Sequence, residues 1–355
     1  MYAGRKVIDV HGHMSSPPQF RAWAYNLIAL RSPGDGELEI SDELMQTALS
    51  RHLQVMDERA IDVQLISPRP VAMMHWERPF LVQKWTRTTN DAIHQQCRMH
   101  PTRFVGVAQL PQSRDLDTSN CLTELERCVT ELGFAGAILN PDPGADGRTP
   151  GVSDPYWYPL YEKAQALGAT LIVHPSISKD PRLETISHGY QFNNLTEETL
   201  ATLLYEQGDV FDRFPELRIV VCHCGGALRR LLEIGARAAG GVVGESGQRS
   251  GGQVGVTVRR SRHTKRDTSA NLFFDACAYD KDFLATAIKQ RGPEQMLFGS
   301  EAPGSGTAQQ NPETGRPADD LVPVIDSFEF LSADDKRRIF AENARRVFPL
   351  LRVEG

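Results

Sequence analysis

Short apolar segments of strand length recur along the whole 355-residue chain. They are apolar throughout, whereas a strand with one face in water alternates apolar and polar residues, so both faces of these strands are expected to be buried. Segments with a helical spacing of apolar residues separate most of them. The expected strands cover residues 6–10, 63–67, 104–107, 135–139, 170–173, 218–222, 272–275 and 296–298.

Two of the intervening segments carry clear helix signals. Met45, Leu49 and Met56 repeat on one side of a segment that begins after Ser41, a typical N-cap residue. A serine and an acid at 332 and 335 have the spacing of a capping box before the last helix. Strands and helices are therefore expected to alternate along the chain.

Eight strand–helix units predict a (β/α)8 barrel, the TIM-barrel fold, in a single domain that spans residues 1–355. A doubly wound open sheet is the alternative, but no glycine-rich phosphate loop follows any of the early strands. The sixth unit carries a Gly/Arg-rich insertion at about 239–268. We expect this insertion to be either a solvated excursion or a lid or subunit contact whose basic end gathers an anion.

The composition narrows the class of protein and its partners. With 40% hydrophobic residues the chain can bury a large core, and its net charge of −6 gives no general attraction to nucleic acid or to an anionic membrane. No apolar run reaches the length of a membrane span, and no secretion signal opens the chain. Six thinly spaced cysteines suit reduced thiols, so we expect a cytoplasmic protein. From its charge and the lack of a long apolar run, we expect neither nucleic-acid nor membrane partners.

Polar residues stand where the expected strands end, which is where a TIM barrel carries its chemistry. Four of the ten histidines lie there, namely His11 and His13 after the first strand, His174 after the fifth and His223 after the sixth. An isolated histidine is more often structural than catalytic. Four histidines at equivalent places indicate one shared site.

The first strand offers two imidazoles to one side, because residues i and i+2 of an extended chain project to the same face. With His174 and Glu301, which follows the eighth strand, they provide three nitrogen ligands and one oxygen ligand. This set suits one divalent metal, Zn²⁺ first, with an open position for water or substrate, and Mn²⁺ or Fe²⁺ is also compatible. His223 lies outside the set and suits a general acid or base, because an unperturbed imidazole titrates near neutrality.

Arg69 is the cation at the end of the second strand. Its guanidinium matches a carboxylate in bidentate geometry, which favours a small anionic carboxylic acid as the substrate. The alternative is a salt bridge to a neighbouring loop.

The motifs around these residues resemble those of the amidohydrolase superfamily. "DVHGH", "HPS", "HCGG" and the acid after the eighth strand are similar to the branch that contains aminocarboxymuconate semialdehyde decarboxylase. Within this branch the chain resembles the 4-oxalomesaconate hydratases almost end to end, through segments such as "SPRP", "LNPDP", "FFDACAY", "FGSE" and "NPETG". The resemblance implies a metal-dependent lyase of aromatic-compound breakdown, with a homodimer as its assembly.

The resemblance also implies roles for individual residues. The implied metal ligands are His11, His13, His174 and Glu301. The implied catalytic residues are His223, Glu301 and Arg69, with Glu301 acting as ligand, base or both. The expected substrate contacts are Arg69, Asn140, Tyr190 and Tyr279. The chain departs from the family pattern on the substrate side, at Cys224, at Asp280 and in "APGSGTA" after Glu301.

Four functions are compatible with these residues. The leading hypothesis is a hydratase of an unsaturated keto or enol polycarboxylic acid such as 4-oxalomesaconate. A non-oxidative decarboxylase of an aromatic or muconate-type acid would use the same metal and the same His223. A hydrolase is disfavoured because Asn140 stands where a bridging lysine or glutamate is needed. The fourth is a non-catalytic metal-binding subunit of a larger assembly.

Overall fold

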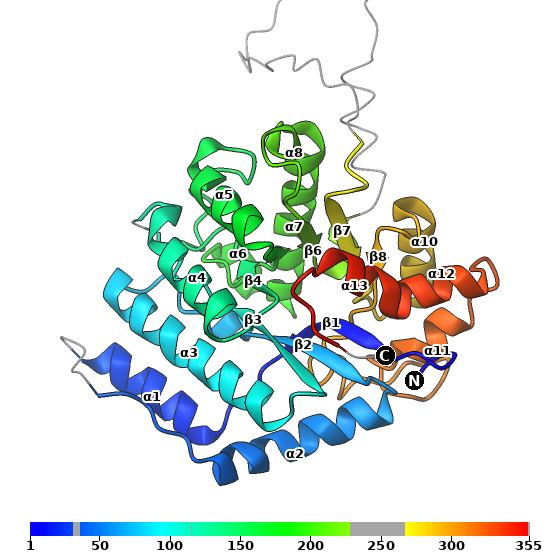
Figure 1. The fold of residues 1–355 in the computed structure, drawn as a ribbon, viewed down its shortest axis with the longest axis horizontal. Coiled ribbons are helices and arrows are strands. Elements are labelled where there is room, and N and C mark those ends of the chain that lie inside the picture. Colours follow the sequence, from blue (N-terminus) through cyan, green and yellow to red (C-terminus); the bar gives the residue numbers. More distant parts are fainter. Residues whose placement is uncertain (31–35, 115, 228–266, 354–355) are drawn as a thin grey trace, which may run out of the picture.

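Eight parallel strands form one sheet in chain order in the computed structural model, which describes residues 1–30, 36–114, 116–227 and 267–353 (Figure 1). The sheet closes on itself because the backbone N–H of Val10 donates to the carbonyl of Phe298, directly after the last strand, at 2.9 Å. The predicted (β/α)8 barrel is confirmed. The strands are β1 (Ile8–His13), β2 (Val63–Ser67), β3 (Phe104–Ala108), β4 (Gly136–Leu139), β5 (Thr170–Val173), β6 (Ile219–Val221), β7 (Leu272–Asp275) and β8 (Met296–Leu297).

Helices surround the sheet and connect successive strands wherever the structure describes the whole connection, which excludes the one from β6 to β7. The expected helix starts are present, since the Ser41 side chain accepts from the Leu44 N–H and Ser332 forms a capping box with Asp335. The helices are α1 (Pro18–Ala29), α2 (Asp42–Glu58), α3 (Pro79–Met99), α4 (Leu122–Thr130), α5 (Tyr158–Leu167), α6 (Pro181–Glu184), α7 (Gly189–Gln207), α8 (Val210–Arg213), α10 (Lys281–Arg291), α11 (Leu321–Asp326), α12 (Ala333–Arg337) and α13 (Asn343–Val347). Short 3₁₀ turns cover Pro70–Ala72, Thr118–Cys121, Pro155–Trp157 and His223–Gly225, and a π turn covers Arg338–Glu342.

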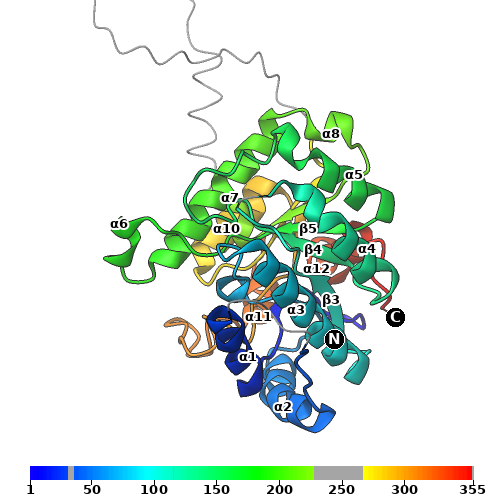
Figure 2. The same ribbon diagram turned by 90° about the vertical axis from the view of Figure 1, so that its left-hand side faces the viewer.

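The two ends of the barrel are built differently. α6 and the segment around residues 300–320 project on one side, and both termini lie on the other (Figure 2). Because β5 leads into α6 and β8 leads into residues 300–320, the first side is the C-terminal mouth of the barrel. At the opposite end, Val347 and Phe348 pack against strand residues such as Ile172 and Phe273 and close the interior.

The first strand is longer than the sequence pattern indicated. The pairing Asp9–Gln64 is followed by Gly12–Ile66, so β1 has one extra residue here and forms a bulge. The strand then continues to His13, which pairs with Ser67. The sequence-based boundary at residue 10 was wrong because polar residues and a glycine resemble the end of an apolar strand.

Other expectations have mixed outcomes. The predicted insertion at 239–268 lies outside the described residues, apart from its last two positions. All six cysteines are free in the structure, and the reduced state of their thiols stays a prediction. Among the helices that the structure describes, none has both the length and the apolar character to cross a membrane.

Gly136 opens β4 at a point where the neighbouring strand passes very close. A Cβ atom there would lie 2.1 Å from the backbone carbonyl oxygen of Thr170 in β5. Because a paired strand cannot move aside locally, we expect Gly136→Ala to lower the free energy of unfolding by about 3 kcal/mol, as overpacking does. Urea unfolding measures this.

Gly133→Ala is the matched control, three residues earlier. Gly133 has a φ of +70° and open space around its Cβ position, so only left-handed strain of about 1 kcal/mol is expected. Equal losses in the two variants would contradict the importance of the close strand approach at Gly136.

Candidate active site

Four histidine rings meet at the C-terminal mouth of the barrel. His11 and His13 belong to β1, His174 directly follows β5, and His223 begins the turn after β6. The ring centroid of His11 lies 5.2 Å from that of His13 and 5.1 Å from those of His174 and His223. The structure thus brings together the four histidines that the sequence assigned to one site.

Acceptors on the far side of two rings determine which nitrogen carries the proton. His11 Nδ1 lies 2.8 Å from a carboxylate oxygen of Asp275, and His174 Nδ1 lies 2.7 Å from the carbonyl oxygen of Pro175. A carbonyl and an ionised carboxylate only accept, so each ring places a proton on Nδ1, and a neutral ring then leaves Nε2 without one. Burial opposes protonation of His11, but Asp275 raises its pKa, so a cation at Nε2 of this ring would take the place of a second proton.

The third ring reaches the same state through a hydroxyl. His13 Nδ1 lies 2.9 Å from Ser67 Oγ, and that hydroxyl donates its own proton to the Gly12 carbonyl at 2.9 Å. Ser67 therefore accepts from His13, which leaves a bare Nε2 on this ring as well. In the part of the chain that the structure describes, the buried Nε2 atoms of His11, His13 and His174 have no hydrogen-bond partner.

This arrangement fits a divalent metal. Burial lowers the pKa of His13 to about 4, and burial followed by the neighbouring imidazoles lowers the pKa of His174 well below its usual value. Both rings are therefore neutral at pH 7 and keep a lone pair on Nε2. Histidines that bind metals commonly donate their other ring proton to a carboxylate or carbonyl, as His11 and His174 do here. The described residues can hold a divalent metal at this position.

Glu301 brings a carboxylate to the same place. Its backbone N–H donates to the His11 carbonyl at 2.7 Å, and one carboxylate oxygen lies 3.6 Å from His13 Nε2. The other oxygen accepts from the hydroxyls of Tyr279 at 3.1 Å and Ser305 at 3.0 Å. Burial opposes ionisation, but the surrounding imidazoles hold the pKa of Glu301 well below its usual value. The carboxylate is ionised and fixed by two hydroxyl groups.

His223 is held by a carboxylate from a helix. Its Nδ1 lies 2.7 Å from Glu198 Oε1 on α7. Glu198 is fully buried, and its second oxygen has no hydrogen-bond partner among the described residues. Burial alone would lower the pKa of His223, but Glu198 raises it to about 10, while burial raises the pKa of Glu198 to about 7. His223 thus turns a protonated Nδ1 to Glu198 and leaves Nε2 for the mouth of the barrel.

Position alone favours His223 over the predicted ligand His13, because His11, His174 and His223 form a group of possible ligand atoms and His13 lies outside it. One ring nitrogen of His223 lies within 4.8 Å of ring nitrogens of His11 and His174. Charge separates them, because Glu198 favours the protonated form of His223 and burial favours neutral His174. A protonated imidazole has no lone pair for a metal.

Two of the predicted substrate contacts, Arg69 and Tyr190, are partly exposed to solvent. Arg69 is half-buried; burial lowers the pKa of its guanidinium, and the negative charge of Glu301 acts in the opposite direction. None of the described carboxylates lies within ion-pair distance of Arg69. The alternative salt bridge to a neighbouring loop is not found among the described residues. Tyr190 is 41% exposed near the start of α7, where Glu301 contributes to a raised pKa after burial does.

The other two predicted contacts are engaged within the protein. The amide of buried Asn140 lies 3.1 Å from His75 Nδ1, and its oxygen accepts from the Asp142 N–H at 3.2 Å. The Tyr279 hydroxyl donates to Glu301. For these two residues, substrate contact stays a prediction.

Sequence reasoning missed Glu198 and gave no role to Asp275. Asn194, Glu198 and Ala201 are all buried positions of α7, so Glu198 lies on the inward face of the helix. Charged residues are seldom fully buried unless they are paired. A glutamate on the inward side of a helix was therefore the available signal.

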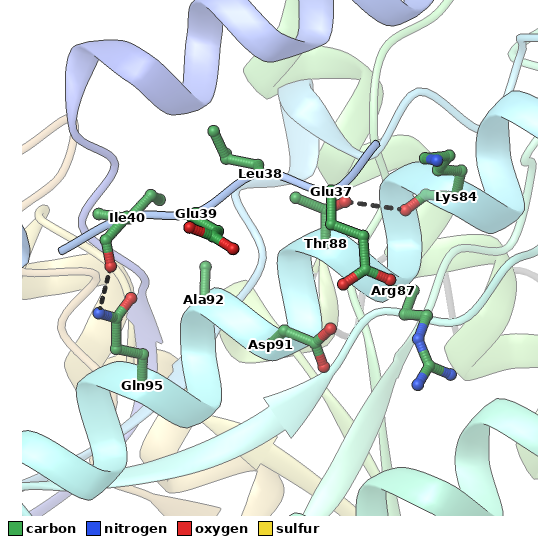
Figure 3. A pocket seen from close by; sticks show the side chains of 10 residues that line it. All are labelled: Glu37, Leu38, Glu39, Ile40, Lys84, Arg87, Thr88, Asp91, Ala92 and Gln95. Carbon is green, nitrogen blue, oxygen red and sulfur yellow. Dashed lines mark hydrogen bonds between the residues drawn. The ribbon is translucent and has the colours of Figure 1, made fainter. Parts of the chain in front are cut away.

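A separate groove lies away from these histidines. It has a volume of about 290 Å³ and runs between residues 37–40 and one face of α3 (Figure 3). Glu37, Glu39 and Asp91 share its walls with Lys84 and Arg87, so both signs of charge are present. Its lining includes none of the predicted site residues, and this mixed surface does not match a polycarboxylate.

A family model described as amidohydrolase matches residues 8–350. The chain belongs to the amidohydrolase family. A 2-keto-4-carboxy-3-hexenedioate hydratase of Sphingobium sp. is 33% identical, over 97% of this chain and 96% of its own length. The crystal structure of a 4-oxalomesaconate hydratase from Rhodopseudomonas palustris has a TM-score of 0.79 at 30% identity, covering 97% of this chain and 96% of that chain.

A more distant relative has a different activity. A 2-amino-3-carboxymuconate-6-semialdehyde decarboxylase of Dictyostelium discoideum is 25% identical, over 82% of this chain and 74% of its own length. Hydratases and decarboxylases are both lyases, so the predicted family and the predicted lyase class are confirmed.

Asp275 should control how well the site binds a metal. The asparagine in Asp275→Asn has an amide that can donate a hydrogen bond to His11 Nδ1 as well as accept one. The His11 proton can then move to Nε2, which removes the lone pair that a metal needs. We expect the affinity for Zn²⁺ to fall about 10- to 100-fold, measured by competition with a chelator. Asp282→Asn, on the exposed side of α10, is the control and should bind Zn²⁺ as the unaltered protein does. Unchanged affinity in Asp275→Asn would show that His11 does not need this partner.

Proposed function

We propose that the protein adds water across the double bond of an unsaturated keto or enol polycarboxylic acid, with 4-oxalomesaconate as the substrate to test. The observation that carries the proposal is an ionised carboxylate and a protonated imidazole side by side. An oxygen of Glu301 lies within 4.8 Å of a ring nitrogen of His223, and their surroundings lower the pKa of the first and raise that of the second. Groups whose pKa values are driven apart in this way suit a base and an acid.

The substrate named for the Sphingobium relative defines what such a pair must do. Its ketone at C2 is conjugated to the double bond between C3 and C4, which makes C4 electrophilic. Water forms a C–O bond at C4, the double-bond electrons move to C3 and the ketone, and a proton then joins C3. The reaction needs a base for the water and an acid for C3.

We assign these two tasks to Glu301 and His223. Glu301 takes a proton from the attacking water, while the hydroxyls of Tyr279 and Ser305 hold its other oxygen in place. His223 delivers a proton from Nε2 to C3, and the Glu198 carboxylate stabilises the imidazolium and orients the ring. These roles require that Nε2 of His223 and the remaining carboxylate oxygen of Glu301 face the substrate.

Arg69 would bind a carboxylate of the substrate. Its guanidinium is half-buried and without a carboxylate partner among the described residues, so an anionic ligand would fill an available place. Tyr190 would contact the substrate from the rim. A substrate with several carboxylates matches this cation and the metal position together.

His11, His13 and His174 would hold the metal, with Glu301 as fourth ligand, base or both. This nitrogen-rich set suits Zn²⁺, and Mn²⁺ or Fe²⁺ is also tolerated. When bound, the ion supplies Lewis-acid polarisation of substrate oxygens. The bare Nε2 atoms of the three rings support this assignment.

The direct test adds 4-oxalomesaconate to zinc-loaded protein and follows its conjugated absorbance together with released CO₂. Hydration removes the absorbance and releases no CO₂. His223→Asn should lose turnover by about 100-fold or more and keep its metal. No absorbance change at micromolar enzyme would contradict this substrate. Released CO₂ would instead favour the second candidate function, a decarboxylase, which the similarity to the Dictyostelium decarboxylase supports.

Glu198 should affect turnover more than binding. Glu198→Gln keeps an oxygen for His223 Nδ1 but removes the charge that stabilises the imidazolium. We expect kcat to fall about 10- to 100-fold, with KM and metal content within about twofold of the unaltered protein. Glu197→Gln, at the neighbouring position of α7, is the matched control and should retain kcat. Equal kcat values for both variants would remove Glu198 from the mechanism.

A further inference from the structure

Glu301 has an unusual backbone conformation that its neighbours in the chain hold in place. Its φ of 58° is left-handed, a conformation that a residue with a side chain keeps only where the surrounding structure fixes it. On one side, the N–H of Ser300 donates to the Asp9 carboxylate at 3.1 Å. On the other side, the carbonyl of Ala302 accepts from the side-chain amide of Gln64 at 2.6 Å. The two residues that flank Glu301 are therefore both anchored to buried side chains.

The side chain of Gln64 links these two anchors. Its amide nitrogen has two protons and donates one to the Ala302 carbonyl and the other to the Asp9 carboxylate, which lies 2.8 Å away. A carbonyl can only accept, so the amide nitrogen faces these two groups and the amide oxygen points away from them. Gln64 is fully buried, so water does not compete for either hydrogen bond.

His52 on α2 holds the other end of this amide. Its Nε2 lies 2.7 Å from Gln64 Oε1, and its Nδ1 lies 2.9 Å from Ser15 Oγ. Burial lowers the pKa of His52 to about 4, so the ring is neutral at pH 7 and carries one proton. An amide oxygen only accepts, so this proton lies on Nε2, and Nδ1 accepts from the serine hydroxyl. The orientation of the Gln64 amide is thus determined from both ends.

Gly12 leaves the space that Gln64 occupies. A Cβ atom at this position, between the two histidines of β1, would lie 2.2 Å from the Cδ atom of Gln64. Any other residue at position 12 would therefore push the Gln64 side chain away from Asp9 and Ala302. The glycine of the "DVHGH" motif accordingly has a packing reason, which is the close approach of this one side chain.

We propose that Gln64 is a positioning residue for Glu301, with His52 as its support. It acts through Ala302 and Asp9 rather than on the reacting atoms. The inference rests on the proposed function, in which Glu301 takes a proton from the attacking water. A misplacement of about 1 Å can cost a reacting group about 100-fold in rate. This loss falls on kcat rather than on KM, because the base acts in the chemical step.

Amide hydrogen exchange in zinc-loaded protein tests the anchor without turnover. The N–H groups of residues 300–302 all donate within the protein, so their exchange reports on the backbone around Glu301. Gln64→Met keeps the length of the side chain but cannot donate, and exchange at 300–302 should become about tenfold faster or more. The N–H of Phe298, which donates to the Ile339 carbonyl outside this network, should exchange as before. Unchanged exchange at 300–302, or equal acceleration at Phe298, would overturn the positioning role.

Asn343→Leu is the matched control. The buried amide of Asn343 also donates to two acceptors, the carbonyls of Pro293 and Met296, at the opposite end of β8. This variant should lower the free energy of unfolding but leave the exchange of residues 300–302 and kcat within about twofold. Equal losses of kcat in Asn343→Leu and Gln64→Met would overturn the proposal, because the effect would then not depend on the contact with Ala302.

Turnover provides the second readout. Gln64→Met should lower kcat about 10- to 100-fold and leave KM within about threefold. Faster exchange with an unchanged kcat would overturn the claim that the anchor serves the reaction. If the unaltered protein shows no hydration, the exchange rates still decide whether Gln64 positions Glu301. If Gln64→Met does not fold, as judged by circular dichroism, His52→Phe replaces it, because this change removes the N–H that holds the amide oxygen.

Discussion

Three imidazole rings are fixed through Nδ1 so that each leaves its buried Nε2 without a hydrogen-bond partner among the described residues, and the rest of the site depends on this constraint. A buried polar atom without a partner costs about 1–3 kcal/mol. His11, His13 and His174 each contribute one such Nε2 atom among the described residues. A divalent cation held by these rings would offset this cost because every nitrogen would gain a bond, so the metal would stabilise the folded protein as well as the reaction site. The partners at Nδ1 make this possible, since they remove the alternative in which the proton sits on Nε2.

The closure of the barrel places the carboxylate of Glu301 next to these rings. Buried Asp9 accepts hydrogen bonds from the backbone N–H and the hydroxyl of Ser300 and from the side-chain amide of Gln64. These three hydrogen bonds connect β1, β2 and the residues after β8. Glu301 follows directly, with a left-handed φ of 58°, and His223 has a left-handed φ of 47°. Such backbone costs about 1–2 kcal/mol for each residue. The strain coincides with the proposed base and acid, where the surrounding hydrogen bonds hold it.

The sequence predicts most of the fold and half of the site, for physical reasons. Buried parallel strands require continuous apolar runs, and a TIM barrel carries its functional polar residues at the C-terminal ends of these strands. The four histidines and Glu301 could therefore be found from the sequence. The Nδ1 partners could not, because a hydroxyl, a carbonyl and a carboxylate at these places have no sequence pattern. Glu198 comes from a helix 25 residues before His223 and meets it only in the folded chain. Tyr279 stands after the seventh strand and was predicted to contact the substrate, and nothing in the sequence indicates that its hydroxyl donates to Glu301.

The central claim is that these imidazoles surround one divalent ion. X-ray absorption at the zinc edge, recorded on protein loaded with one equivalent of Zn²⁺, tests it most directly. The account predicts three imidazole nitrogens and at least one oxygen at about 2.0–2.2 Å from the ion, with the multiple-scattering pattern of histidine rings. A coordination shell without imidazole scattering, or protein that retains no zinc after dialysis, would contradict it.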